Sequence, residues 1–488
     1  MRNDKSFHII TLGCPKNTVD AENMTAVLEN AGYQEEGDPS EADVIIVNTC
    51  CFILPAKQEA VDTIYEAAGI TQETGGKLIV TGCMPQRYKD ELADEFVEVD
   101  SWMGLENLEE IVPVVKETLE GKKVRKFYGE TPSKQIELPR KVSTPSHYAY
   151  LKIAEGCSHA CSFCVIPQIR GKYRSLPMED AVESATKLVT AGHKEIILIA
   201  QDTTLYGLDI YGRKMLPELL KKLAGIEGLN WLRLMYAYPT SLDDEVLRTI
   251  ASEEKICKYL DIPLQHSHPE VLKKMGRPFA EKDTVGLIER IRNIIPDVTL
   301  RTAFITGHPG ETPARFEHLM DFVEQMRFHN VGVFTYSAEE GSQSAEFKTR
   351  PSGAEAERRR EKLMQLQQGI SAELRSQKVG KVIPAVCDSI IGNGKRMTDL
   401  IEEAAAKARE SGESVNFEED GFLIDISGEE TIISSHIPAG TTAIGRTIND
   451  APEIDSVLFI KGEPPKAGEF FNASITGADV YDLTGEKA

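Results

Sequence analysis

Three short apolar segments in the first third of the chain each run into a cysteine, and a helical pattern follows each of them. The three cysteines are Cys14, Cys50 and Cys83. Continuous apolar strands that alternate with helices are typical of a parallel sheet buried on both faces, so we predict an α/β domain over residues 1–125. Because ligands of such sheets bind at the carboxyl ends of the strands, we expect the three cysteines to converge there.

A second series of apolar segments occupies the middle of the chain, after a polar, proline-containing linker at 126–146. Strands are expected at 148–153, 195–200, 231–236, 259–262, 299–305 and 331–336. Helical patterns separate most of them, and six βα units predict a partial (β/α)6 barrel over residues 147–376. A long charged helix at about 354–379 should lead out of this barrel.

The last part of the chain, residues 377–488, changes to short strands typical of a small antiparallel β-barrel. These strands are expected at 422–426, 442–446, 456–460 and 470–475. An acidic, alanine-rich helical stretch at about 398–420 interrupts them. We therefore expect three domains, of α/β class overall, with an insertion in the third.

Composition and cysteine usage indicate the class of protein. The chain has 488 residues, of which 27% are charged and 41% are hydrophobic. No apolar run approaches the roughly 18 residues that a membrane span needs, and the N-terminus has too few apolar residues for a signal-peptide core. We therefore expect a cytoplasmic protein without a membrane partner, whose nine cysteines stay reduced and can bind metal.

The most specific motif is Cys157-x3-Cys161-x2-Cys164, which follows the first strand expected in the barrel. Three thiolates in so short a loop can each bind one iron of a [4Fe-4S] cube and leave the fourth iron for an exogenous ligand. A structural zinc site would need a second cysteine pair. A ferredoxin loop would need a different spacing and a Cys-Pro. Both alternatives stay open, but the motif fits them poorly.

This triplet, with Phe163 directly before its last cysteine, resembles the signature of the radical S-adenosylmethionine (SAM) superfamily. The resemblance implies that the open iron binds SAM and that an electron from the cluster cleaves it to methionine and a 5′-deoxyadenosyl radical. Residues 192–195 are similar to the superfamily's Gly-Gly-Glu motif, and residues 302–311 are similar to its glycine-rich motif. Gln201, at the end of another expected strand, could also line the pocket. The candidate SAM contacts are Gly192, Glu195, Gln201, Gly307, Gly310 and Glu311. An ordinary turn between strand and helix is the alternative for both segments.

Cys14, Cys50 and Cys83, with their neighbouring residues, resemble the N-terminal domain of the methylthiotransferases, and residues 443–447 and 451–455 resemble the TRAM domain of these enzymes. The resemblance implies a second [4Fe-4S] cluster that holds the sulfur to be inserted. It also implies two roles for SAM, as methyl donor and as radical source, and no side chain that acts as acid or base. Three buried structural cysteines are the alternative. Three further cysteines, Cys51, Cys257 and Cys387, match no ligand position. Cys51 could in principle replace its neighbour Cys50.

Two branches of this family differ in substrate. One modifies isopentenyl-adenosine beside the tRNA anticodon, and the other modifies the β-carbon of an aspartate in the ribosomal protein number twelve of the small subunit. The residues after Cys14, Pro15-Lys16-Asn17-Thr18, resemble the ribosomal-protein branch. The tRNA branch typically has Gln-Met-Asn at this place.

The charge of the chain favours the same branch. The formal charge is -22, and residues 377–488 carry 10 Lys and Arg against 20 Asp and Glu, a net of -10. Nucleic acid is therefore not expected as the primary partner, because phosphate contacts need a basic surface. A basic ribosomal protein is expected instead. A tRNA methylthiotransferase and a non-catalytic iron–sulfur electron carrier or sensor are the alternatives, and the sequence identifies neither a sulfur donor nor an electron donor.

Overall fold

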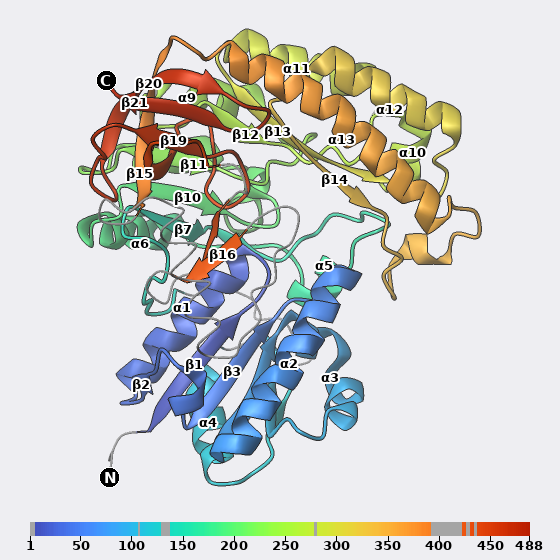
Figure 1. The fold of residues 1–488 in the computed structure, drawn as a ribbon. Coiled ribbons are helices and arrows are strands. Elements are labelled where there is room, and N and C mark those ends of the chain that lie inside the picture. Colours follow the sequence, from blue (N-terminus) through green and yellow to red (C-terminus); the bar gives the residue numbers. More distant parts are fainter. Residues whose placement is uncertain are drawn as a thin grey trace.

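The computed structural model describes residues 5–105, 108–127, 137–277, 281–391, 422–425, 430–433 and 437–488. Three units follow one another along the chain: a parallel sheet, an arc of parallel strands and a closed barrel (Figure 1). The acidic helical stretch expected at about 398–420 lies outside the described residues, and so does part of the linker expected at 126–146.

The N-terminal unit is a parallel sheet with helices on both faces, as predicted. Its strands lie in the order β2 (Gln34–Glu35), β1 (Ser6–Thr11), β3 (Val44–Thr49), β4 (Lys77–Gly82), β5 (Ser101–Met103) and β6 (Arg125–Lys126). The helices are α1 (Pro15–Asn30), η1 (Pro39–Glu41), α2 (Leu54–Thr74), α3 (Cys83–Glu95), η2 (Leu108–Glu110) and α4 (Ile111–Leu119). Val44 and Ile46 of β3 pack with α1 and α4, whereas Ile45 and Val47 pack with α2 and α3. Because every residue of β3 is buried, its first four residues, 44–47, form a continuous apolar run rather than an alternating pattern.

The six strands predicted for the middle of the chain are present, and their pairing is parallel. They are β7 (Tyr148–Lys152), β10 (Glu195–Ile199), β11 (Trp231–Leu234), β12 (Tyr259–Asp261), β13 (Thr299–Thr306) and β14 (Asn330–Thr335). Hydrogen bonds form two sheets, β11-β10-β7 and β12-β13-β14, and a bridge between Leu232 and Ile256 lies between them. The strands thus form an open arc, which is the expected partial barrel.

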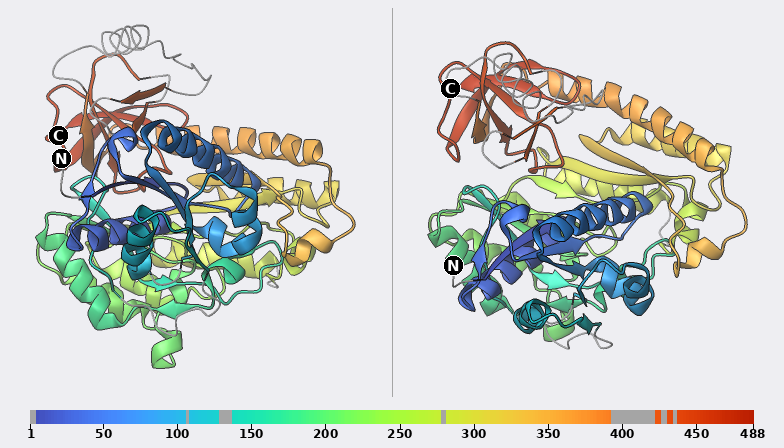
Figure 2. Two further views of the ribbon diagram at one scale, coloured as in Figure 1. Left: turned by 90° about the horizontal axis from the view of Figure 1, so that it is seen from below. Right: turned by 60° about the horizontal axis from the view of Figure 1, so that its bottom comes forward.

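Helices cover the outside of this arc and share its core with the strands. They are α6 (Met178–Thr190), α8 (Leu216–Ala224), α9 (Asp244–Ser252), α11 (Glu281–Ile294), α12 (Pro313–Met326) and α13 (Gly353–Ser376). Shorter elements lie between them: β8 (Ala154–Glu155), α5 (Ile166–Arg170), β9 (Arg174–Ser175), η3 (Thr203–Leu205), α7 (Leu208–Tyr211), α10 (Pro269–Lys274) and η4 (Gln343–Glu346). The long α13 runs along the arc to the C-terminal barrel (Figure 2). No helix in the described part of the chain is long and apolar enough to cross a membrane.

The C-terminal unit is a closed barrel with the strand order β15 (Val382–Ile390), β18 (Thr441–Thr447), β19 (Leu458–Lys461), β21 (Leu483–Lys487) and β20 (Phe470–Ala478). One pair, β19 with β21, is parallel, and the other pairs are antiparallel. The prediction of a barrel strand at 422–426 was wrong: β16 (Phe422–Asp425) pairs with β17 (Glu430–Ile433) in a separate two-stranded sheet. Pairing with the next segment forms a local ladder along one edge of β16, and the same short apolar pattern suits either arrangement.

The amino ends of the arc strands pack against the C-terminal barrel. Glu195 begins β10 and is fully buried, 2.8 Å from Arg233 of β11 and 2.6 Å from Arg446 of β18. Tyr259 begins β12, and its hydroxyl donates to Asp455 of the C-terminal unit at 2.6 Å. The C-terminal barrel therefore covers this end of the arc, and the carboxyl ends of the strands lie on the opposite side.

We expect the Arg446→Leu variant to be less stable than the wild type by about 3 kcal/mol, because it leaves the buried Glu195 with one arginine in place of two. Urea unfolding followed by circular dichroism measures the loss. Arg213→Leu is the matched control: the Arg213–Glu218 pair is exposed to solvent and should contribute under about 1 kcal/mol. Equal losses in the two variants would contradict the importance of this interface.

Candidate functional site

Cys14, Cys50 and Cys83 follow three adjacent strands of the N-terminal sheet. Cys14 lies between β1 and α1, Cys50 directly follows β3, and Cys83 is the first residue of α3 after β4. Two glycines with positive φ allow close packing here. A Cβ on Gly13 would lie 2.6 Å from the Cβ of Cys50, and one on Gly82 would lie 2.5 Å from the carbonyl oxygen of the residue before Cys50. The structure therefore brings these three strand ends together.

Asn17, in the first turn of α1, ties the cysteine segments to one another. Its side-chain amide donates to the carbonyl oxygens of Leu12 at 2.8 Å and Thr49 at 3.0 Å. Its backbone carbonyl accepts from the Asn48 amide at 2.9 Å, and its amide oxygen lies 3.8 Å from the sulfur of Cys83. Because Asn17 is fully buried, these bonds hold the ends of β1 and β3 in place beside Cys83.

Burial raises the pKa of the Cys50 and Cys83 thiols, and the Arg170 guanidinium offsets part of that rise. A metal centre binds the thiolate and so displaces the proton. Cys51 is fully buried in the apolar cluster that includes Ala60 and Ile64 of α2, and burial raises its pKa to about 12. Cys50, and not Cys51, is therefore the residue whose sulfur lies against the Cys14 segment. Two other cysteines are also fully buried, Cys257 and Cys387.

Cys157, Cys161 and Cys164 lie in the loop between β8 and α5, which follows the first strand of the arc. Each sulfur accepts one N–H group: Cys157 and Cys164 accept from the backbone two residues further along, both at 3.5 Å, and Cys161 accepts from Arg277 at 3.4 Å. Such donors favour the thiolate, although burial still raises the pKa of Cys157 to about 11 and that of Cys164 to about 12. All three residues remain partly exposed.

The donor sets of the two triplets fit iron–sulfur cubes. Within the described ranges, no three His, Cys, Asp or Glu side chains come close enough together for one metal ion. A [4Fe-4S] cube does not need this, because its thiolates bind different irons at separate corners. Each triplet offers three thiols from one region with N–H donors beside them, as is common around clusters. Each set would leave one iron open.

Polar residues beyond the carboxyl ends of β10, β11 and β12 lie beside the second triplet. Asp202 is fully buried and lies 2.7 Å from the imidazole of His159, whose ring stacks on Tyr238 with 3.7 Å between centroids. Two non-glycine residues at these ends have positive φ, Tyr236 at 58° and Gln265 at 74°. Such conformations are uncommon and occur often at functional sites.

Four of the predicted SAM contacts lie at or just beyond the carboxyl ends of strands: Gln201 after β10, and Gly307, Gly310 and Glu311 after β13. The amide oxygen of Gln201 is buried without a hydrogen-bond partner among the described residues. Glu311 is buried and already engaged, since it accepts from the backbone of Gly307 and lies 3.1 Å from Arg359 of α13. A Cβ on Gly307 would lie 2.4 Å from the side chain of Ala356. Close packing on α13 therefore explains in part why glycine and glutamate occur in this turn.

Gly192 and Glu195 lie at the other end of β10, and the expectation that they contact SAM is contradicted by the structure. Gly192 follows α6, and Glu195 is the first residue of the strand, where Arg233 and Arg446 hold its carboxylate. In a parallel arrangement, the amino ends of strands lie opposite the ligand-binding carboxyl ends. The residues that resemble the Gly-Gly-Glu motif, 192–195, lie at the start of β10, whereas a residue that contacts the ligand has to lie after the end of the strand.

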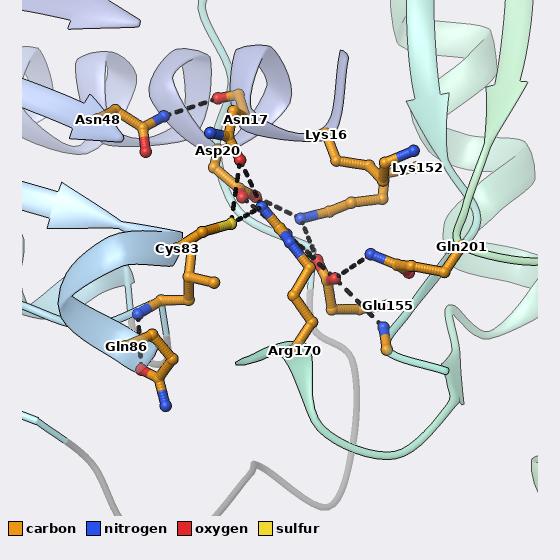
Figure 3. Close-up of polar contacts among 12 residues, drawn as sticks. Lys16, Asn17, Asp20, Asn48, Cys83, Gln86, Lys152, Glu155, Arg170 and Gln201 are labelled. Atoms are coloured by element: carbon orange, nitrogen blue, oxygen red, sulfur yellow. Dashed lines mark hydrogen bonds and ion pairs between the residues drawn. The ribbon is translucent and has the colours of Figure 1, made fainter. Parts of the chain in front are cut away.

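A buried network of four charges joins the N-terminal unit to the arc (Figure 3). Lys152 ends β7, Glu155 follows in β8, Arg170 ends α5, and Asp20 lies on α1. Lys152 lies beside Asp20 and 2.9 Å from Glu155, and Arg170 lies 3.1 Å from Asp20 and 3.0 Å from Glu155. Each cation thus pairs with both carboxylates, so the network is neutral and all four residues can be buried.

Arg170 carries this network to the cysteines. Its Nη2 lies 3.5 Å from the sulfur of Cys83 and 2.5 Å from the amide oxygen of Asn17, and its helix begins two residues after Cys164. One side chain from the helix that follows the loop of the second triplet therefore contacts the first triplet. Arg170 was not predicted from the sequence, because a single turn of helix shows no periodicity. The only signal was a charge in an apolar segment beside Cys164.

Three protein families match successive parts of the chain. Residues 6–104 match the Uncharacterized protein family UPF0004, residues 151–323 the Radical SAM superfamily, and residues 429–487 the TRAM domain. A protein of Thermoanaerobacter sp. (strain X514), named Ribosomal protein uS12 methylthiotransferase RimO, is 42% identical over 99% of this chain and 100% of its own length.

The chain belongs to the RimO family of ribosomal protein uS12 methylthiotransferases. Members of this name from Lachnoclostridium phytofermentans and Clostridioides difficile are each 41% identical over 98% of this chain, and the match covers 98% and 97% of their lengths. A solved structure of the radical SAM methyltransferase TsrM from Kitasatospora setae, with cobalamin and a [4Fe-4S] cluster bound, has a TM-score of 0.51 at 16% identity. That match covers 68% of this chain and 75% of TsrM, and it shows the shared fold. The RimO family is therefore one of radical SAM methylthiotransferases, which implies the use of SAM and a [4Fe-4S] cluster.

The pH dependence of stability should report on the buried network. Burial alone would raise the pKa of Glu155, but Arg170 and Lys152 outweigh it and hold that pKa well below its ordinary value. Such a carboxylate contributes stability above its unfolded pKa of about 4.3, and the contribution is lost as the pH falls below that value. We expect Glu155→Gln to be less stable than the wild type at neutral pH and to lose less stability between about pH 5 and pH 3.

Urea unfolding at several pH values provides this measurement. Glu245→Gln, at an exposed position of α9, is the control and should keep the wild-type profile. A Glu155→Gln profile parallel to that of the wild type would show that the four charges do not act as one network.

Proposed function

We propose that this chain transfers a methylthio group to the β-carbon of an aspartate in ribosomal protein uS12. The full-length relatives that bear the name of this activity support the proposal. The observation that carries it is the contact of Arg170 with Cys83. Arg170 ends α5, the short helix that directly follows the loop of the second cysteine triplet, and transfer of a group between two centres requires that both centres lie at one site.

We assign a [4Fe-4S] cluster to each triplet, with one open iron apiece: Cys157, Cys161 and Cys164 for the cluster that binds SAM, and Cys14, Cys50 and Cys83 for the second. When bound, the first cluster and SAM supply the one-electron chemistry that breaks an unactivated C–H bond, for which acid–base groups alone would not suffice. The protein itself holds the sulfurs in place. Arg277 donates to Cys161 and Arg170 donates to Cys83, so each anionic centre would have a cation beside it.

We propose that Gln201 and the turn with Gly307 and Gly310 line the SAM site. Two buried polar atoms support this position, because the Gln201 amide oxygen and His308 Nε2 have no hydrogen-bond partner among the described residues. Buried polar groups without a protein partner commonly bind a ligand or water. The phenyl ring of Phe163, beside the last cysteine, lies edge-on to His308 with 6.3 Å between centroids. The SAM site would therefore extend from the second triplet to the end of β13.

The charge of the chain supports a protein partner. The formal charge of -22 attracts a basic ribosomal protein and repels RNA, which argues against tRNA as the substrate. A ribosomal substrate would place the reaction in the cytoplasm. We also propose three functional units, 1–125, 147–376 and 377–488, with a linker at 126–146 between the first two. In support, β6 ends at Lys126, the first residue of this linker, and α13 ends at Ser376, directly before the third unit.

Mass spectrometry identifies the substrate directly. Reduced, iron-loaded enzyme is incubated with SAM, a sulfide source and either uS12 or tRNA. We expect uS12 to gain the mass of one methylthio group in place of one hydrogen, on a peptide that contains an aspartate, and tRNA to stay unchanged. Modification of tRNA alone would overturn the proposal.

Cysteine variants separate the roles of the two triplets. The wild type should bind about eight irons, and either triple alanine variant should bind about four. Replacement of Cys157, Cys161 and Cys164 should abolish SAM cleavage, because the cluster that binds SAM is lost. Replacement of Cys14, Cys50 and Cys83 should abolish methylthio transfer, whereas SAM cleavage continues. Four irons in the wild type would contradict the second cluster.

A further inference from the structure

Lys16 lies where the N-terminal unit meets the carboxyl ends of the arc strands. It is the second residue of α1, it follows Cys14 by two positions, and it is only 8% exposed. Its ammonium lies 3.5 Å from the carbonyl oxygen of Ala200 at the end of β10, and 3.7 Å from the ring centroid of Tyr236 beyond the end of β11. The cation therefore reaches from the first cysteine triplet to the mouth of the partial barrel.

The acidic groups near Lys16 are engaged by other cations. Asp20, one turn further along α1, is held by the two cations of the buried network. Asp261, which accepts from the backbone of Tyr236, is held by Arg301 at 2.9 Å. Lys16 forms no ion pair with any carboxylate in the part of the chain that the structure describes, and in Figure 3 its side chain extends past the network without a contact to it.

A buried ammonium of this kind is suited to bind an anion. Desolvation of an unpaired charge is unfavourable, and one carbonyl oxygen and one aromatic ring offset it only in part. Tyr236, whose ring lies against the ammonium, has a φ of 58°, a costly conformation for a non-glycine residue that often occurs at functional sites. Lys16 and all four network charges lie on segments that adjoin a cysteine triplet or on the strand β7. The unpaired ammonium of Lys16 therefore lies within the candidate site, against Ala200 and Tyr236.

We propose that Lys16 binds the side-chain carboxylate of the target aspartate. The inference rests on the proposed function and adds the group that selects an acidic residue. The β-carbon of an aspartate is bonded directly to its carboxyl carbon, so a carboxylate held by Lys16 presents the β-carbon at the mouth of the barrel between the two triplets. Lys16 is thus a specificity-determining residue of this site, and a neutral amide in place of the carboxylate would lose the charge-assisted hydrogen bond.

Binding measurements with two forms of uS12 test this assignment. Iron-loaded wild-type enzyme and the Lys16→Gln variant are titrated with native uS12 and with uS12 whose target aspartate is replaced by asparagine. We expect the wild type to bind the aspartate form about tenfold or more tightly than the asparagine form. Lys16→Gln should bind both forms equally, at the affinity of the wild type for the asparagine form, and should keep the wild-type iron content.

Lys77→Gln is the matched control. Lys77 begins β4, at the end of the sheet away from the cysteines, where it pairs with Asp100, and its variant should keep the wild-type preference. A preference for aspartate that persists in Lys16→Gln would overturn the inference, and so would a loss of iron in that variant, since Lys16 would then support the cluster instead. A wild type that methylthiolates uS12 but binds both forms equally refutes the inference alone, whereas a wild type that neither binds nor modifies uS12 refutes the proposed function as well.

Discussion

The pairing of Asp20 and Glu155 with Lys152 and Arg170 is the interaction on which the arrangement of the site depends. Its members come from two units of the chain, and each cation contacts both carboxylates. A buried charge without its partners is strongly unfavourable, so the two units cannot shift apart without a large cost. Because Arg170 also contacts Cys83, the same pairing sets how the first cysteine triplet lies relative to the second.

The two ends of the partial barrel have separate tasks in this arrangement. The amino ends of the strands are closed by the C-terminal barrel, with Glu195 between Arg233 and Arg446. The carboxyl ends meet the N-terminal unit, with Lys16 against the end of β10. The polar and strained residues that suit ligand binding, such as Asp202 and Tyr236, lie at the second end. The residues that stabilise the domain interface and the residues of the candidate site thus lie at opposite ends of one set of strands, as is usual for barrels of this kind.

The fold and the cysteine segments could be predicted from the sequence because both depend on local patterns. Buried parallel strands are apolar throughout, and a cysteine directly after such a strand lies at its carboxyl end wherever the strand is placed. The pairing of distant charges has no such pattern: Asp20 and Arg170 resemble ordinary surface residues until the fold brings them together. The prediction that Glu195 contacts SAM was wrong for a related reason, since the resemblance to a motif did not reveal at which end of the strand the residue lies. β16 was misplaced because a short apolar segment does not specify its partner strand.

Iron anomalous X-ray scattering from crystals of the anaerobically reconstituted enzyme tests the central claim most directly. The claim is that two clusters share one site, with Arg170 between the triplets. The account predicts two iron-specific density peaks, one within bonding distance of Cys14, Cys50 and Cys83 and the other of Cys157, Cys161 and Cys164, with the Arg170 guanidinium between them. Iron density at one triplet only, or two peaks separated by the folded units with Arg170 in solvent, would contradict it.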